Sequence, residues 1–148
     1  SRNELLMLID ADLSEFKKED ITKLITPVIN KKVDMTINLI ESSPVLSKII
    51  GLDFLSGIRV FSKKLINNKD IEKLHGFGLE VYINKKIIEK NLKIKIVRWH
   101  NVTQPVKTQK FGFFKGIKEL CKMIFQINKT ISFFEMGYQI IRLSYLKI

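Results

Sequence analysis

Hydrophobic positions along the chain follow two periodicities, which predict alternating strands and helices. Residues 5–9 form an uninterrupted apolar run, typical of a strand that is buried on both faces. Apolar residues recur every three or four positions over residues 21–29 and predict a helix, which Pro27 should kink and which should end near residues 30–32. Residues 33–40 alternate between apolar and polar and predict a second strand. The order strand, helix, strand predicts a βαβ unit with parallel strands.

The pattern after this unit continues the alternation of helices and strands. The expected elements are a short helix, a strand or strand entry, a second long helix and a half-exposed strand, over residues 45–50, 53–61, 79–91 and 92–99. Residues 101–112 are polar and predict a loop. We therefore expect residues 1–112 to form an α/β unit, with a mixed but mainly parallel sheet and flanking helices.

The tail, residues 113–148, is helical in character. Its first part carries an apolar stripe with lysines around it, and a break near residues 128–132 separates this part from a second helix. The apolar residues of the second helix are Met136, Ile140, Ile141 and Leu143. A basic amphipathic helix can lie in a membrane interface, whereas packing on the sheet or on a partner chain explains the same pattern. The first interpretation predicts peripheral contact with the inner face of a membrane.

Length and composition narrow the class of protein. The chain has 148 residues, enough for one domain with an apolar core, and a formal charge of +11 that would attract phosphates or anionic lipids. Only four of the 26 basic residues are arginines, and no zinc spacing, helix-turn-helix or RNA-binding motif accompanies the lysines, so we expect no nucleic-acid partner. Cys121 is the sole cysteine, and the sequence contains neither a signal-peptide pattern nor a membrane-spanning apolar run. These features predict a cytoplasmic protein.

Two carboxylates follow directly after the first apolar run. Asp10 and Asp12 are separated by one residue and would share a side if the strand geometry continued through them. Neighbouring carboxylates at the carboxyl end of a buried strand are costly unless a hard cation neutralises them. The pair therefore predicts a site for Mg²⁺ or Mn²⁺, and a cation held in this way would in turn hold phosphates.

Three short motifs occur in the order Leu8-Ile9-Asp10-Ala11-Asp12-Leu13-Ser14, Leu55-Ser56-Gly57-Ile58-Arg59 and Gly76-Phe77-Gly78-Leu79-Glu80-Val81. In this order they resemble the family 2 glycosyltransferases of the GT-A fold, nearest the branch of polyprenyl-phosphate sugar transferases and glucosyl-phosphoglycerate synthases. The resemblance runs from residue 5 to about residue 112 and implies a partial GT-A (Rossmann-like) fold. The implied reaction moves a sugar, with inversion, from a nucleotide sugar to a hydroxyl or phosphate acceptor, which would be a lipid phosphate, a saccharide or a small hydroxyl compound.

The resemblance also implies roles for individual residues. Asp10 and Asp12 match the Asp-x-Asp motif that holds the metal against the diphosphate of the donor. Glu80 is the candidate general base for direct displacement, with sugar binding as its alternative role. The residues implied to bind donor or acceptor in these motifs are Ser56, Gly57, Arg59 and Gly78. Among them, Arg59 could hold a phosphate through two hydrogen bonds.

The loop after the last predicted strand departs from the family pattern. Relatives often have a metal-binding histidine at the position of Gln104, and here the nearest histidine is His100. His100 is therefore a candidate third metal ligand, and the alternative is a partly buried structural histidine beside Trp99. Lys107 and Lys110 lie in the same loop and would either close over phosphates or remain solvated.

A second departure concerns the start of the domain. A complete GT-A domain begins with a half that binds the nucleoside, and the sequence before Leu5 contains nothing of that kind. We therefore expect a fragment of a longer protein, inactive by itself, whose exposed sheet edge favours homo-oligomers. The competing hypothesis is a basic, non-catalytic α/β module that binds an anionic polymer or a membrane surface.

Overall fold

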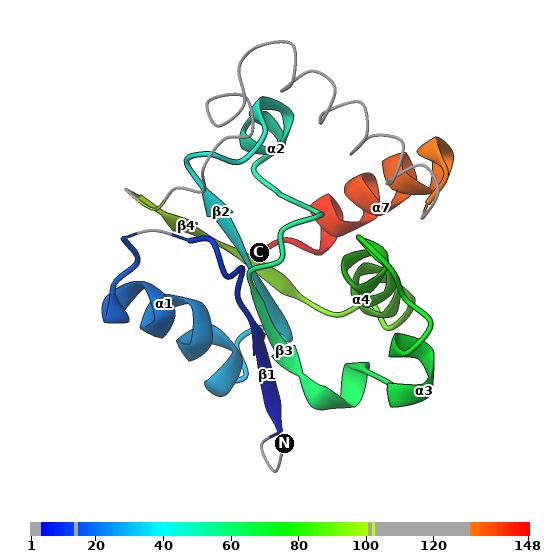
Figure 1. Cartoon of the computed structure of the whole chain (residues 1–148), viewed down its shortest axis with the longest axis horizontal. Coiled ribbons are helices and arrows are strands. Elements are labelled where there is room, and N and C mark those ends of the chain that lie inside the picture. The colour runs from blue at the N-terminus through cyan, green and yellow to red at the C-terminus, as the bar shows by residue number, and fades with distance from the viewer. Residues whose placement is uncertain (1–3, 14, 101, 103–130) are drawn as a thin grey trace.

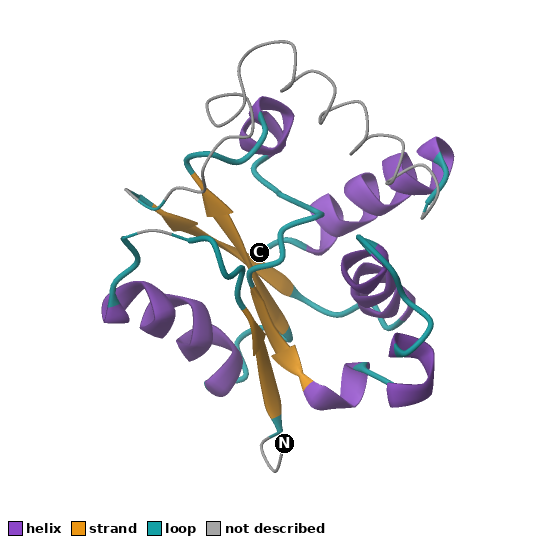
Figure 2. Ribbon diagram, in the orientation of Figure 1, coloured by secondary structure: helices purple, strands orange, loops and turns teal. Residues whose placement is uncertain are grey.

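The computed structural model describes residues 4–13, 15–100, 102 and 131–148, which form a mixed α/β fold (Figure 1). In chain order the elements are β1 (Leu5–Leu8), α1 (Lys18–Ile29), β2 (Met35–Ile40), α2 (Val45–Ile50), β3 (Arg59–Ser62), the 3-10 helix η1 (Lys63–Leu65), α3 (Asn68–Ile71), α4 (Gly78–Glu89), β4 (Ile94–Trp99) and α7 (Phe133–Leu146). Figure 2 shows the strands in the middle of the fold with helices on both sides. The mixed α/β class expected from the sequence is confirmed.

The sheet differs from the prediction in the order of its strands. The order is β1-β3-β2-β4, and β3 runs antiparallel to both of its neighbours, while β2 and β4 pair in parallel. Thus β1, β2 and β4 share one direction, as expected for a βαβ unit, but β1 and β2 are not neighbours. The sheet is mixed, as predicted, but it is not mainly parallel, because only one of the three pairings in the described sheet is parallel.

The first apolar run is less buried than predicted. All four residues of β1 are half-buried, because β1 is an edge strand that pairs along one side with β3. Leu6 and Leu8 pack against one core cluster, and Leu5 and Met7 pack against the other. The strand pairing ends at Leu8, opposite Arg59, so strand geometry does not continue into the carboxylate pair.

The core forms two layers, one on each face of the sheet. Leu24 and Val28 of α1 belong to one layer, and Ile83 and Ile87 of α4 belong to the other, together with Leu143 of α7. Figure 1 shows α1 on one side of the sheet and α4 and α7 on the opposite side. The helices therefore cover both faces of the sheet, as the flanking helices of the prediction require.

The second strand is buried along its whole length, including its polar positions. Thr36 donates its hydroxyl hydrogen to the carbonyl of Leu24 at 2.7 Å, and the Asn38 amide donates to the carbonyl of Val97 at 3.1 Å. These bonds satisfy donors that would otherwise be costly inside the core, while Oδ1 of Asn38 has no hydrogen-bond partner among the described residues. The alternating pattern thus predicted the strand correctly, but it did not predict that the polar positions are buried as well.

Residues 53–61 were expected to form a strand or strand entry, and the strand itself begins at Arg59. A turn precedes it, in which the Ser56 amide donates to the carbonyl of Asp53 at 3.1 Å and the Ser56 hydroxyl accepts from the amide of Ile58 at 3.2 Å. Serine and aspartate favour such turns because their side chains can bond to nearby backbone groups. The segment before β3 is therefore a structured loop.

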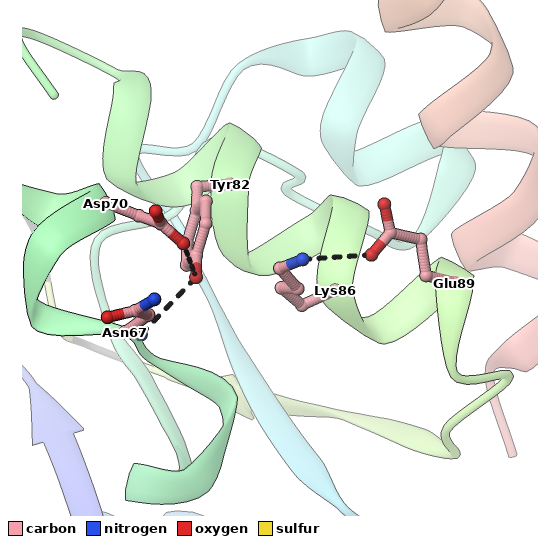
Figure 3. A network of polar contacts seen from close by, with 5 residues as sticks. All are labelled: Asn67, Asp70, Tyr82, Lys86 and Glu89. Atoms are coloured by element: carbon pink, nitrogen blue, oxygen red, sulfur yellow. Dashed lines mark hydrogen bonds and ion pairs between the residues drawn. The ribbon is translucent and has the colours of Figure 1, made fainter. Parts of the chain in front are cut away.

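The outer face of α4 carries an exposed polar network (Figure 3). The Tyr82 hydroxyl donates to the carboxylate of Asp70 at 3.0 Å and accepts from the amide of Asn67 at 3.4 Å, which joins α3 to α4. One turn along, Lys86 forms an ion pair with Glu89 at 3.1 Å. None of the helices in the described ranges is long and apolar enough to cross a bilayer.

Candidate functional site

Arg59 holds the loop before β3 from inside the protein. Its guanidinium is fully buried and donates to the carbonyl of Ser56 at 2.8 Å and to the carbonyl of Phe54 at 3.2 Å. A third bond, at 3.0 Å, runs to the side-chain oxygen of Asn84 on α4, whose amide nitrogen also donates to the carbonyl of Phe54. The loop, the start of β3 and α4 are therefore joined by one buried polar network.

The charge of Arg59 is retained despite its burial. Removal from water lowers the pKa of Arg59 to about 10, and the negative charges of Glu80, Asp53 and Asp10 oppose this effect. The side chain stays protonated at neutral pH and provides the cation around which the three carboxylates gather. Because it has no exposed surface and donates three bonds to protein acceptors, its predicted contact with a ligand phosphate would require the network to open.

Glu80 lies in the first turn of α4 and faces this network. Burial raises the pKa of the Glu80 carboxyl, and the charge of Arg59 and a bond from the glutamate's own backbone amide act in the opposite direction. Its Oε2 atom is buried and has no hydrogen-bond partner among the described residues. A buried carboxylate oxygen without a donor is costly, and it is well suited to accept a proton from a bound group.

Asp10 approaches the same loop from the end of β1. A side chain at Gly57 would overlap the Asp10 carboxylate, so the absence of a Cβ atom at Gly57 is what lets the two segments come together. Asp12, two residues later, is exposed. The two carboxylates predicted to act together therefore have different surroundings: Asp10 belongs to the cluster around Arg59, and Asp12 lies at the surface.

Asp53 is a further carboxylate of the cluster. Burial raises its pKa, while hydrogen bonds from the Ser43 hydroxyl and the Leu55 amide, and the charge of Arg59, lower it. No motif in the sequence pointed to Asp53 or Asn84 as site residues. A usable signal existed for Asn84, because it lies four residues after Glu80 and hence on the same face of the helix, between the apolar residues Ile83 and Ile87.

A preformed metal cage is absent from the part of the chain that the structure describes. No group of three or more His, Cys, Asp or Glu side chains there is placed to hold a metal ion. A Mg²⁺ ion that arrives with a phosphate ligand needs only one or two protein carboxylates, because phosphate oxygens and water supply its other ligands.

His100 follows the end of β4, at the opposite edge of the sheet from β1. The segment after Asp12 nevertheless crosses to that edge, where the Phe16 ring stacks on Trp99 with 6.3 Å between ring centroids. The His100 side chain is exposed, not partly buried beside Trp99 as the structural alternative would have it. Among the described residues, His100 does not form a group with Asp10 and Asp12 that is placed to hold a metal ion.

The other predicted site residues have separate roles in the fold. Ser56 uses its hydroxyl to close the turn, as described above. Gly78 is buried at the start of α4, where a Cβ atom would lie 3.2 Å from the side chain of Leu74. Lys107 and Lys110 lie outside the described residues. The structure thus brings together Asp10, Gly57, Arg59 and Glu80, one or two residues from each of the three motifs.

Comparison with known proteins adds no assignment to this geometry. No protein-family model matches the chain, and no curated protein matches its sequence.

Proposed function

We propose that the chain is part of a metal-dependent glycosyltransferase of family 2, which moves a sugar from a nucleotide sugar to a hydroxyl or phosphate acceptor. One observation carries the proposal: Asp10, the Gly57 loop and Glu80, which are far apart in sequence, meet around the buried cation of Arg59. A transferase of this kind would use its three motifs side by side, so their proximity supports the proposal. We propose that the sheet and its flanking helices form a partial GT-A fold.

In this proposal Asp10 and Asp12 are the protein ligands of a Mg²⁺ or Mn²⁺ ion. The bound ion would stabilise the negative charge that grows on the departing nucleoside diphosphate. The exposed position of Asp12 leaves it accessible to a ligand from solvent, while Asp10 is held by its contact with the loop.

Glu80 is the proposed general base. The acceptor oxygen attacks the anomeric carbon of the sugar, the bond from that carbon to the diphosphate oxygen breaks, and the acceptor proton passes to Glu80. Because burial raises the pKa of Glu80, its carboxylate is a stronger base than an exposed one, and activity should fall as the pH drops through that raised pKa. Arg59 and Asn84 are positioning residues, since they hold the loop rather than contact the reacting atoms.

A second candidate function rests on a different surface. A groove of about 590 Å³ between α1 and β4 is lined by Lys23, Lys32, Lys95 and Arg98, and by no acidic residue. Four cations along one groove favour an anionic ligand. This observation supports the alternative of a basic, non-catalytic module that binds an anionic polymer or surface.

Release of nucleoside diphosphate separates the two functions. We expect the protein, in its full natural length and with Mg²⁺ or Mn²⁺, to release nucleoside diphosphate from at least one member of a panel of nucleotide sugars that differ in base and sugar. Asp12→Ala should abolish this release, because the cation loses its most accessible ligand. The matched control is Glu72→Ala, which removes an exposed carboxylate from the region of α3.

Glu80→Gln tests the role of the base. A large loss of turnover with donor binding retained is expected for a base, whereas loss of donor binding would indicate a sugar contact. Glu89→Gln, on the outer face of the same helix, is the control. Turnover that survives both Asp12→Ala and Glu80→Gln would contradict the proposal, as would polyanion binding without any donor-dependent release.

A further inference from the structure

Helix α7 presents apolar side chains on two sides. One side packs into the core: Gln139 and Leu143 are fully buried, and Leu146 contacts the cluster that contains Ile83 and Ile87 of α4. On the other side lie Phe134, Tyr138, Ile141 and Tyr145, which we call the α7 stripe. Its members follow one another at intervals of four, three and four residues, so they share one face of the helix.

The α7 stripe is too exposed to be part of the core. Its four side chains are between 51 and 92% exposed, and Phe133 beside them is also exposed. Contiguous exposed apolar residues of this size mark a surface that contacts something else. Of the apolar residues predicted for this helix, Leu143 belongs to the core, Met136 and Ile140 are half-buried, and Ile141 belongs to the stripe.

We infer that the α7 stripe is a docking surface for an anionic lipid membrane, with α7 lying in the plane of the interface. Two of its members are tyrosines, whose rings and hydroxyls suit the boundary between headgroups and acyl chains. The helix has 14 residues, about 21 Å at 1.5 Å per residue, which fits a helix that lies on a bilayer rather than across it.

Charge favours a lipid surface with negative headgroups. After α7 the chain continues through Lys147 to Ile148, whose amide donates to the carbonyl of Ile94 at 3.0 Å at the start of β4. There Ile148 lines the basic groove of Lys23, Lys32, Lys95 and Arg98. The C-terminal end of α7 is therefore joined, through Lys147 and Ile148, to a groove that carries four cations and no acidic residue. Negative lipid headgroups complement this charge, and apolar contact with nearby cations is what strengthens the binding of interfacial helices to anionic membranes.

A second copy of the chain is a less suitable occupant. The stripe extends over only two heptads, fewer than the three or four that sustain a coiled coil. Each copy would also bring a formal charge of +11, and that repulsion opposes self-association. Binding of the stripe to lipid is independent of any transferase activity, so the two proposals can fail separately.

Co-sedimentation with vesicles tests the inference. We expect the full chain to bind vesicles of phosphatidylcholine and phosphatidylglycerol, and to bind much less to vesicles of phosphatidylcholine alone. Phe134→Ser combined with Tyr145→Ser should lower the partition coefficient by at least about tenfold, because each aromatic ring loses most of its apolar transfer energy. Ile141→Ser alone should lower it several-fold.

Ile29→Ser is the matched control for Ile141→Ser. Ile29 lies on α1, across the sheet from α7, and the two isoleucines are 59 and 58% exposed. Circular dichroism should show that each variant is folded, because the substituted side chains are exposed and contribute little to the core. Equal losses for the two isoleucine variants would overturn the inference, because they would indicate general stickiness rather than a defined surface.

The charge requirement has its own pair of variants. Lys23→Glu with Lys95→Glu should weaken binding to anionic vesicles, and added salt should do the same. Lys64→Glu with Lys69→Glu changes the net charge equally, away from the groove, and should have a much smaller effect. Equal binding to neutral vesicles would overturn the inference. So would a dimer, detected by light scattering and lost in the stripe variants, without vesicle binding.

Discussion

The two faces of α4 hold similar polar residues in very different surroundings. On the inner face, Asn84 accepts a hydrogen bond from the buried guanidinium of Arg59, and the half-buried Glu80 interacts with its charge. On the outer face, Tyr82 and Lys86 form the exposed network of Figure 3. Water can replace the outer contacts at little cost, whereas a donor or acceptor that loses its partner on the inner face has no replacement. Burial, rather than the number of contacts, should therefore decide which face matters for stability.

The largest expected effect follows from removing the central cation. Arg59→Met should lower the free energy of unfolding by about 3–5 kcal/mol, because three neighbouring carboxylates lose their positive partner and three acceptors lose a donor. Denaturation with urea measures the change. The comparison predicts no measurable change for Lys86→Met on the outer face, and similar losses for both variants would contradict it.

A smaller loss is expected when the partner of the cation is removed. Asn84→Leu keeps a similar volume but leaves one nitrogen of Arg59 without an acceptor, which should cost about 1–3 kcal/mol. The same denaturation experiment applies, with Arg59→Met combined with Asn84→Leu as the coupling test. Losses that simply add would show that the two side chains do not interact energetically.

The pH dependence of stability should distinguish Glu80 from an outer glutamate. The folded protein holds the proton of Glu80 more tightly than the unfolded chain, since burial raises its pKa. Stability should therefore fall as the pH rises from the ordinary pKa of a carboxyl to the raised value, and it stays reduced above that value.

Glu80→Gln removes this contribution. The variant should be more stable than the unmodified chain near neutral pH, and its stability should depend less on pH across that window. Some dependence remains, because the pKa of Asp53 is raised in the same direction. Unfolding curves recorded over the acid to neutral range provide the measurement, with Glu89→Gln as control. Identical pH profiles of stability for the two variants would show that burial does not raise the pKa of Glu80.

The smallest effect is expected on the outer face. Tyr82→Phe removes the hydroxyl that joins α3 to α4 and should cost about 0.5 kcal/mol, the lower limit for a hydrogen bond, because Asp70 and Asn67 are exposed and can bond to water instead. Thermal unfolding detects such a change as a small shift in midpoint. A loss as large as that of Asn84→Leu would remove the distinction between the two faces.

Local periodicity was sufficient to identify most elements of the fold. The helical spacing over residues 21–29 and the predicted helix over residues 79–91 correspond to α1 and α4, and the predicted short helix over residues 45–50 matches α2. These patterns depend on which residues lie on one face of a single element, and that information is contained in a short window of sequence. The segment before β3 was expected to be a strand or strand entry, but it forms a turn closed by local bonds of Ser56. Its bond to Asn84 on α4 spans 30 residues and lies beyond such a window.

The sequence by itself determined the α/β class, the positions of the three short motifs that contain Asp10, Gly57 and Glu80, and the excess of basic charge. Only the tertiary structure decided that β3 lies between β1 and β2, that Arg59 is buried, and that Asp10 rests on Gly57 while His100 lies at the far edge of the sheet. The physical reason is that strand pairing and burial depend on contacts between residues distant in the chain, which no single stretch of sequence records.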